Sequence, residues 1–108
     1  MSTFGARLKQ ARQLAGLSQR QLGILAGIAP GSSSARMNQY ERETHEPPAT
    51  LVRKLARVLG VPTPFFYAEK NEHAELLLAF AKLPAAQRRK ILTEVRKAAV
   101  NTAAKQEA

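Results

Sequence analysis

The fold is decided by residues 17–41, LSQRQLGILAGIAPGSSSARMNQYE, which read as two short helices joined by a linking segment. Ser18 is placed to cap the first helix, and Gln21 can reach back to the Ser18 amide to complete a capping box. Apolar residues then recur at helical spacing, and Gly23 removes side-chain bulk where another helix could cross closely. The pattern predicts a helix that starts at about Gln19.

The second helix is expected to include residues 35–41, with one apolar side and one polar side. The segment before it, residues 29–34, supports two interpretations: a longer flexible turn, or an extra helical turn. In both, Pro30 and Gly31 form a turn, and one of the three serines caps the helix. The extra helical turn is favoured, because a serine followed by Ala35 makes a good helix start. A helix N-terminus there would also direct free backbone amides toward a phosphate.

The composition excludes several classes of chemistry. The 108 residues leave room for one compact domain and a small appendage, so a catalytic cleft between domains is not expected. Cysteine is absent, which rules out disulfides and thiolate chemistry. Two isolated histidines without any aspartate give no metal-ligand cluster, and there is no nucleophile–base pair or phosphate loop. We therefore expect no enzyme activity, no metal and no cofactor.

The charge is strongly positive and unevenly distributed. A net charge of +9 and a pI near 10.7 favour an anionic partner such as nucleic acid or a membrane surface. Residues 1–40 contain basic side chains and no acidic one, whereas the acids begin at Glu41. The positive field is therefore concentrated in the half with the helix pair. Since no apolar run approaches a membrane span and the N-terminus lacks a signal-peptide core, we expect a cytoplasmic protein without a membrane partner.

Three further helices complete an expected first domain, residues 1–69. The first helix is capped by Ser2 or Thr3. The fourth covers residues 50–59, and a short fifth helix follows Thr63 as its cap. The sequence therefore predicts an all-α fold.

Two more helices form an expected C-terminal extension, residues 70–108. The first, over residues 72–82, has an apolar face too wide to leave in water. The second begins at Ala85 with an apolar stripe and a basic face, and frays beyond about Ala103. This hairpin could fold back on the first domain or pack on a second copy. We favour homodimerisation, because the first domain is complete without these faces.

Several separated segments match one known family in order. They are Leu17-Ser18-Gln19, Leu22, Ala26-Gly27-Ile28, Met37-Asn38-Gln39-Tyr40-Glu41, and Pro48 with LVRKLARVLGVP. Together they resemble the XRE family of phage-repressor-like (Cro/cI-type) helix-turn-helix regulators. The resemblance implies a five-helix repressor-like DNA-binding domain followed by a two-helix extension. Two departures lie beside the DNA-reading surface: about four extra residues before Met37, one helical turn in length, and Glu43 in place of a common turn glycine.

The resemblance implies that a recognition helix near Ser33 to Glu41 enters the DNA major groove. The base-reading candidates by position are Ser34, Ala35, Arg36, Asn38 and Gln39. Gln39 is the strongest of these because its amide can pair bidentately with adenine, and Arg36 can do the same with guanine. Because of the inserted residues, Ser32 or Ser33 could replace the first two candidates.

Contacts to the DNA backbone are expected from a second set of residues, namely Arg7, Gln19, Arg20, Ser33 and Arg42. Gln19 can hold a phosphate with its side-chain amide and the backbone amides of the helix end. The resemblance also implies an ion pair between Arg12 and Glu41 that fastens the first helix to the recognition helix. One recognition helix covers few base pairs, so we expect a dimer on half-sites about 34 Å apart in a partly palindromic operator.

The predicted function is a sequence-specific double-stranded DNA-binding transcriptional regulator, and more specifically a repressor. Two other interpretations stay open. One is an architectural DNA binder without sequence preference, for which the high pI is equally good evidence. The other is an antitoxin-like or adaptor module that holds a protein partner through Leu77 to Val95. A flat sequence preference would select the former, and copurification of a stoichiometric partner the latter.

Overall fold

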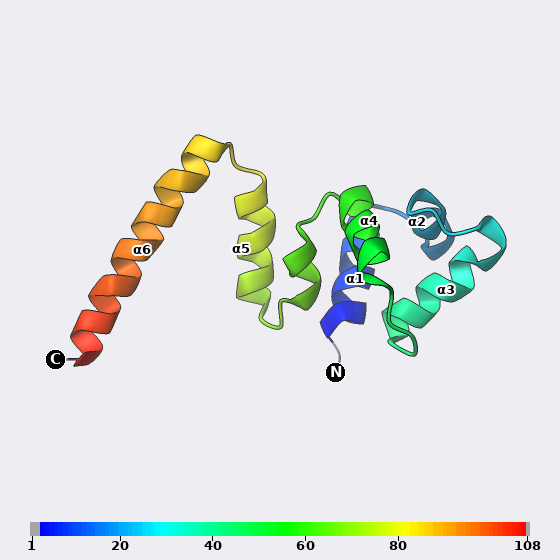
Figure 1. Cartoon of the computed structure of the whole chain (residues 1–108), viewed down its shortest axis with the longest axis horizontal. Coiled ribbons are helices and arrows are strands. Elements are labelled where there is room, and N and C mark those ends of the chain that lie inside the picture. Colours follow the sequence, from blue (N-terminus) through cyan, green and yellow to red (C-terminus); the bar gives the residue numbers. More distant parts are fainter. Residues whose placement is uncertain (1–2, 108) are drawn as a thin grey trace. The chain divides into compact units, whose positions relative to one another are not determined.

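The computed structural model describes residues 3–107, which form helices and no strand within that range (Figure 1). In chain order the elements are α1 (Thr3–Leu14), α2 (Gln19–Leu25), α3 (Pro30–Arg42), α4 (Ala49–Leu59), the 3-10 helix η1 (Thr63–Tyr67), α5 (Asn71–Ala81) and α6 (Ala85–Glu107). The predicted all-α fold class is confirmed. Within this range, no helix is long and apolar enough to cross a membrane.

The chain divides into two units, residues 1–78 and 79–108. The predicted boundary after residue 69 is wrong, because α5 contributes to the core of the first unit. Ala74 of α5 is buried in that core, and Leu77 and Leu78 pack against it. Part of the wide apolar face expected on this helix is therefore covered within the first unit itself, whereas Leu76 is 56% exposed.

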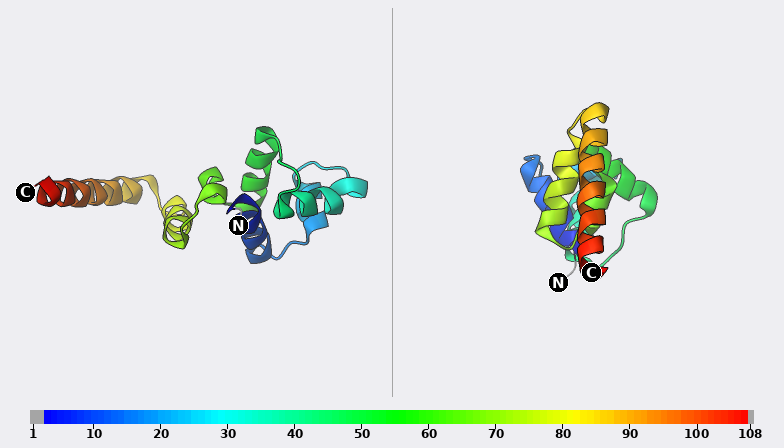
Figure 2. Two further views of the ribbon diagram at one scale, coloured as in Figure 1. Left: turned by 90° about the horizontal axis from the view of Figure 1, so that it is seen from below. Right: turned by 90° about the vertical axis from the view of Figure 1, so that its left-hand side faces the viewer.

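The core of the first unit is made where the apolar faces of α1 to α4 and η1 meet. Its fully buried apolar side chains are Leu8, Leu22, Met37, Leu55, Phe65 and Phe66. α2 and α3 lie side by side in this unit, as Figures 1 and 2 show from different directions. η1 closes the core, because its two phenylalanines pack against each other and Phe66 also contacts Phe4 of α1.

The start of α2 follows the sequence prediction. The Ser18 hydroxyl oxygen accepts a hydrogen bond from the Gln21 amide at 3.0 Å, and the Gln21 side-chain oxygen accepts one from the Ser18 amide at 2.8 Å. Two otherwise unpaired amides of the helix end are satisfied in this way. The predicted capping box, with a helix from Gln19, is confirmed.

The start of α3 confirms the extra helical turn but corrects its details. α3 begins at Pro30, so Pro30 and Gly31 are helical and do not form a turn. No serine caps the helix, because the preceding residue is Ala29. Proline suits the first helical position, since its backbone has the helical φ and it lacks an amide that would go unpaired there. The proline therefore starts the helix by itself.

Three other helix ends differ from the prediction. Thr3 is the first residue of α1 rather than its cap, and Ser2 lies outside the described residues. η1 is a 3-10 helix that includes Thr63 and follows Pro62. α6 continues to Glu107 instead of fraying after Ala103. Its sequence contains neither glycine nor proline and is rich in alanine, lysine and arginine, which favour helix.

Candidate nucleic-acid interface

α2 and α3 cross closely at Gly23. A Cβ at this position would lie 2.0 Å from the Ser33 Oγ, so the contact leaves no room for a side chain. Ser33 itself is fully buried, and its hydroxyl donates a hydrogen bond to the Arg20 carbonyl at 2.8 Å. The close crossing at Gly23 is confirmed. The phosphate contact predicted for Ser33 is wrong, because this side chain lies between the two helices.

An ion pair joins α1 to the last turn of α3. The Arg12 guanidinium donates to the two Glu41 carboxylate oxygens at 2.6 and 3.1 Å, and to the Leu17 carbonyl at 3.0 Å. Only 4% of the Glu41 side chain is exposed. The hydrogen bond with Glu41 favours the charged guanidinium and so raises the pKa of Arg12. The predicted pair of Arg12 with Glu41 is confirmed.

Gln19 adds a contact between the start of α2 and α3. Its side-chain nitrogen donates to the Glu41 carboxylate at 3.2 Å and to the Asn38 side-chain oxygen at 3.3 Å. The side chain is half-buried in this position. Gln19 therefore orients Asn38, a role that the sequence did not indicate, and its contact with phosphate stays a prediction.

The C-terminal end of α3 is held by Glu43, which has the left-handed conformation with a φ of 60°. The Glu43 and Thr44 amides donate back to the carbonyls of Tyr40 and Gln39, at 3.3 and 3.0 Å, as in a helix-ending Schellman motif. The Glu43 carboxylate also accepts a hydrogen bond from the Gly5 amide at 2.8 Å. Glu43 thus satisfies an amide in the first turn of α1, for which the sequence suggested only local caps.

The outward face of α3 is defined by residues that recur at helical spacing. These exposed residues are Gly31, Ser34, Ala35, Asn38 and Arg42. Three of the predicted base-reading residues therefore share one face, and Gln39, which is half-exposed, borders it. Arg36 lies on the flank, where it donates to the Tyr40 hydroxyl at 2.9 Å and its guanidinium is 5.9 Å from the ring centroid.

The predicted phosphate-binding arginines separate into two kinds. Arg20 and Arg42 are exposed. Arg7 is only 8% exposed and donates to the Ala68 carbonyl at 2.8 Å, the Gln10 side chain at 2.9 Å and the Asn71 side chain at 3.1 Å. The phosphate contact predicted for Arg7 is wrong, because its guanidinium is used to join α1 to Ala68 and to Asn71 at the start of α5.

Comparison with known proteins agrees with this geometry. A family model described as a helix-turn-helix domain matches residues 3–64, which include all of α2 and α3. The chain belongs to the helix-turn-helix domain family. In such proteins the second helix of the motif is the one that lies in the DNA major groove. In this helix-turn-helix protein, the two helices of the matched motif correspond to α2 and α3.

Two curated relatives of this helix-turn-helix protein are described as uncharacterized HTH-type transcriptional regulators. They come from Sinorhizobium medicae (strain WSM419) and Rhizobium meliloti (strain 1021), and each is 29% identical over 65 residues. The matches cover 60% of this chain and 44% of each relative, so the chain spans less than half the length of these proteins.

A solved structure covers more of the helix-turn-helix protein. The crystal structure of transcriptional regulator BswR is similar with a TM-score of 0.81 and 43% sequence identity. The similarity covers 90% of this chain and 94% of that chain. These relatives are all described as transcriptional regulators.

Proposed function

We propose that this protein is a sequence-specific double-stranded DNA-binding transcriptional regulator that inserts α3 into the major groove. The outward face of α3 carries this proposal. This face is polar and free of bulky apolar side chains. α3 itself is held in place by its close packing on α2 and by the Arg12–Glu41 pair, which joins it to α1. A rigidly held helix presents its side chains to the bases in a fixed geometry, which sequence reading requires.

Two amide side chains give α3 its reading capacity, those of Asn38 on this face and Gln39 at its border. Gln39 and Asn38 can each form a bidentate pair with adenine. Ser34 can donate or accept, and Ala35 can contact a thymine methyl group. Arg36 contributes only if it leaves Tyr40 to pair with guanine, so we place it second to the amides.

The backbone contacts flank the reading helix. We assign phosphate binding to Gln19 and Arg20 near the start of α2 and to Arg42 at the end of α3. These contacts set the register of α3 on the duplex without reading sequence. Because they release counterions, binding is expected to weaken strongly as the salt concentration rises.

We further propose that the protein acts as a homodimeric repressor on a partly palindromic operator, as the XRE resemblance implies. One copy of α3 reads only a few base pairs, and a second copy on a half-site one helical turn away supplies the missing specificity. α6 is the proposed dimer contact, since Ile91, Leu92 and Val95 share one stripe of this helix.

The experiment that tests this function is selection of bound sequences from a random duplex pool with the full chain at about 0.15 M salt. The account predicts recovery of an inverted repeat. A single unpaired half-site would keep the reading role of α3 but contradict the dimer. Retention of DNA without an enriched motif would identify an architectural binder instead. No retention at all would direct attention to a protein partner.

A further inference from the structure

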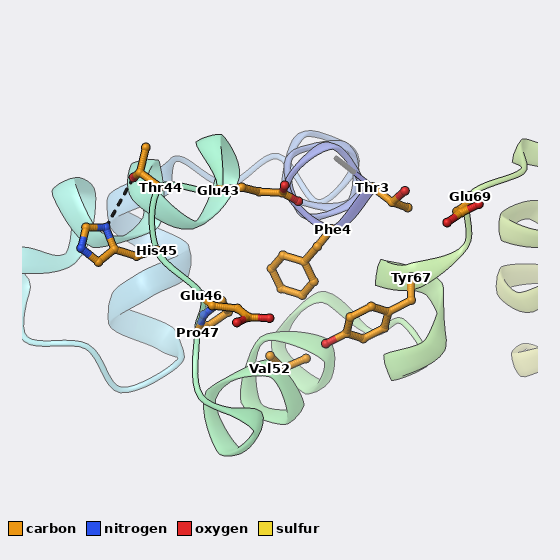
Figure 3. A pocket seen from close by; sticks show the side chains of 10 residues that line it. All are labelled: Thr3, Phe4, Glu43, Thr44, His45, Glu46, Pro47, Val52, Tyr67 and Glu69. Atoms are coloured by element: carbon orange, nitrogen blue, oxygen red, sulfur yellow. Dashed lines mark hydrogen bonds between the residues drawn. The ribbon is translucent and has the colours of Figure 1, made fainter. Parts of the chain in front are cut away.

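A cavity of about 660 Å³ opens between the N-terminal end of α1, the loop from α3 to α4, and the end of η1 (Figure 3). Three carboxylates line it, those of Glu43, Glu46 and Glu69, and none of the described residues that line it is lysine or arginine. The chain has 17 basic and 8 acidic residues. This acidic cavity is therefore a local reversal of the charge of the protein.

Two aromatic rings line the acidic cavity as well. The Phe4 and Tyr67 ring centroids lie 5.6 Å apart at an interplanar angle of 47°. Tyr67 is 58% exposed, so much of its side chain is open to solvent. In Figure 3 the Glu46 carboxylate and the Tyr67 hydroxyl point toward the space beside the Phe4 ring, and Val52 lies next to it. Charged, aromatic and apolar groups thus converge on one space.

This combination fits an organic cation better than a metal ion. Aromatic faces attract a cation through the negative potential of the ring, and carboxylates attract it by charge. A metal ion would need several oxygen or nitrogen ligands at bonding distance of one point. Among the residues that the structure describes, no group of three histidine or glutamate side chains has such an arrangement.

We propose that the acidic cavity binds a small organic ammonium ion, such as an alkylamine or a short diamine. The charged end lies between the Glu46 carboxylate and the Phe4 and Tyr67 rings, and the methylene chain contacts Val52. Glu43 lines the same cavity and accepts the hydrogen bond from the Gly5 amide. A bound ammonium ion is therefore expected to change the environment of the Gly5 amide, where α1 meets the end of α3. This inference does not depend on the proposed function.

The test is titration of the full chain with n-pentylamine hydrochloride, followed by amide NMR at constant ionic strength. n-Pentanol, which has the same chain length and no charge, is the control ligand. Saturable shifts are expected at Phe4, Gly5 and Glu46 with the amine and not with the alcohol. Absence of saturable shifts at these residues, or equal affinity for the alcohol, would overturn the proposal.

Three variants locate the site. Glu46→Gln keeps the shape of the side chain and should weaken amine binding roughly two- to fivefold. Tyr67→Leu keeps an apolar side chain without an aromatic face and should weaken it about threefold or more. Glu75→Gln removes an exposed carboxylate on α5, outside the cavity, and should leave the affinity unchanged. Equal weakening by Glu46→Gln and Glu75→Gln would show attraction to net charge alone and contradict the site.

Discussion

The Glu41 carboxylate accepts hydrogen bonds from two helices at once. Arg12 of α1 reaches its two oxygens at 2.6 and 3.1 Å, and Gln19 of α2 reaches one of them at 3.2 Å. Since the Glu41 side chain is almost fully buried, these hydrogen bonds offset the cost of removing its carboxylate from water. A single residue thus fixes α3 against both α1 and α2.

Removal of one partner from this pair should therefore be costly. Arg12→Ala is expected to lower the free energy of unfolding by about 3 kcal/mol, because it leaves a buried carboxylate without its counter-ion. The double variant Arg12→Met with Glu41→Leu should recover part of that loss, since neither charge remains. Urea unfolding of the wild type and the variants measures both values. A loss under about 1 kcal/mol for Arg12→Ala would place the pair with ordinary surface ion pairs.

Single residues also show what the sequence could and could not predict. The close helix crossing at Gly23 and the capping box of Ser18 both follow from local residue spacing, so the sequence could predict them. The partners of Arg7 lie up to 64 residues away in sequence, at Ala68 and Asn71. A local sequence pattern cannot predict such a distant contact, so the sequence indicated that Arg7 was an exposed side chain available to a phosphate.

At the scale of elements, the angle and distance between α2 and α3 depend on the contact of Gly23 with Ser33. Gly23→Ala should destabilise the protein by about 1 to 3 kcal/mol through overpacking, because the added methyl group overlaps the Ser33 Oγ. Gly31→Ala is the matched control, since its Cβ would meet nothing within 4 Å. That variant should be neutral or more stable by up to about 1 kcal/mol. Thermal unfolding of the two variants would contradict this account if both lost the same stability.

The start of α3 shows why an element boundary was only partly predictable. Proline and glycine in sequence are typical of a turn, yet proline is also favoured as a first helical residue. Both interpretations were compatible with residues 29–34, and the structure places the helix start at Pro30. The exposed face of α3 is lengthened by one turn as a result.

The flanks of α3 give a prediction about salt. Arg20→Ala and Arg42→Ala should each reduce the slope of log K against log salt by about 0.9, because each removes one phosphate contact. Arg57→Ala, an exposed arginine on α4, should leave the slope unchanged. DNA affinity measured at a series of salt concentrations gives all three slopes. Equal reductions in the three variants would point to a diffuse effect of net charge.

At the scale of the whole molecule, the chain is one helix-turn-helix unit followed by a second unit that contains α6. The sequence indicated an extra helical pair but assigned all of α5 to it. The reason is that the apolar pattern of a helix predicts that one face is buried, but not which surface covers that face. Ala74, Leu77 and Leu78 belong with the first unit, so α6 is the element left as the proposed dimer contact.

The dimer proposal makes a direct prediction. Leu92→Glu combined with Val95→Glu places two charges in the α6 stripe and should shift the protein from dimer to monomer. Thr93→Glu is the control, because Thr93 lies on the opposite side of the helix. Sedimentation velocity reports the state of each variant. A monomeric wild type, or a dimer that survives the double change, would contradict the role of α6.

The central claim is that the outward face of α3, together with Gln39 at its border, reads bases, and Gln39→Ala tests it most directly. The affinities of the wild type and the variant are measured for the duplex recovered by selection and for a random duplex, at one salt concentration. The account predicts that Gln39→Ala lowers the affinity for the selected duplex about fivefold or more, through loss of a bidentate base contact, while binding to the random duplex stays unchanged. An equal loss on both duplexes, or no loss on either, would contradict base reading by this face.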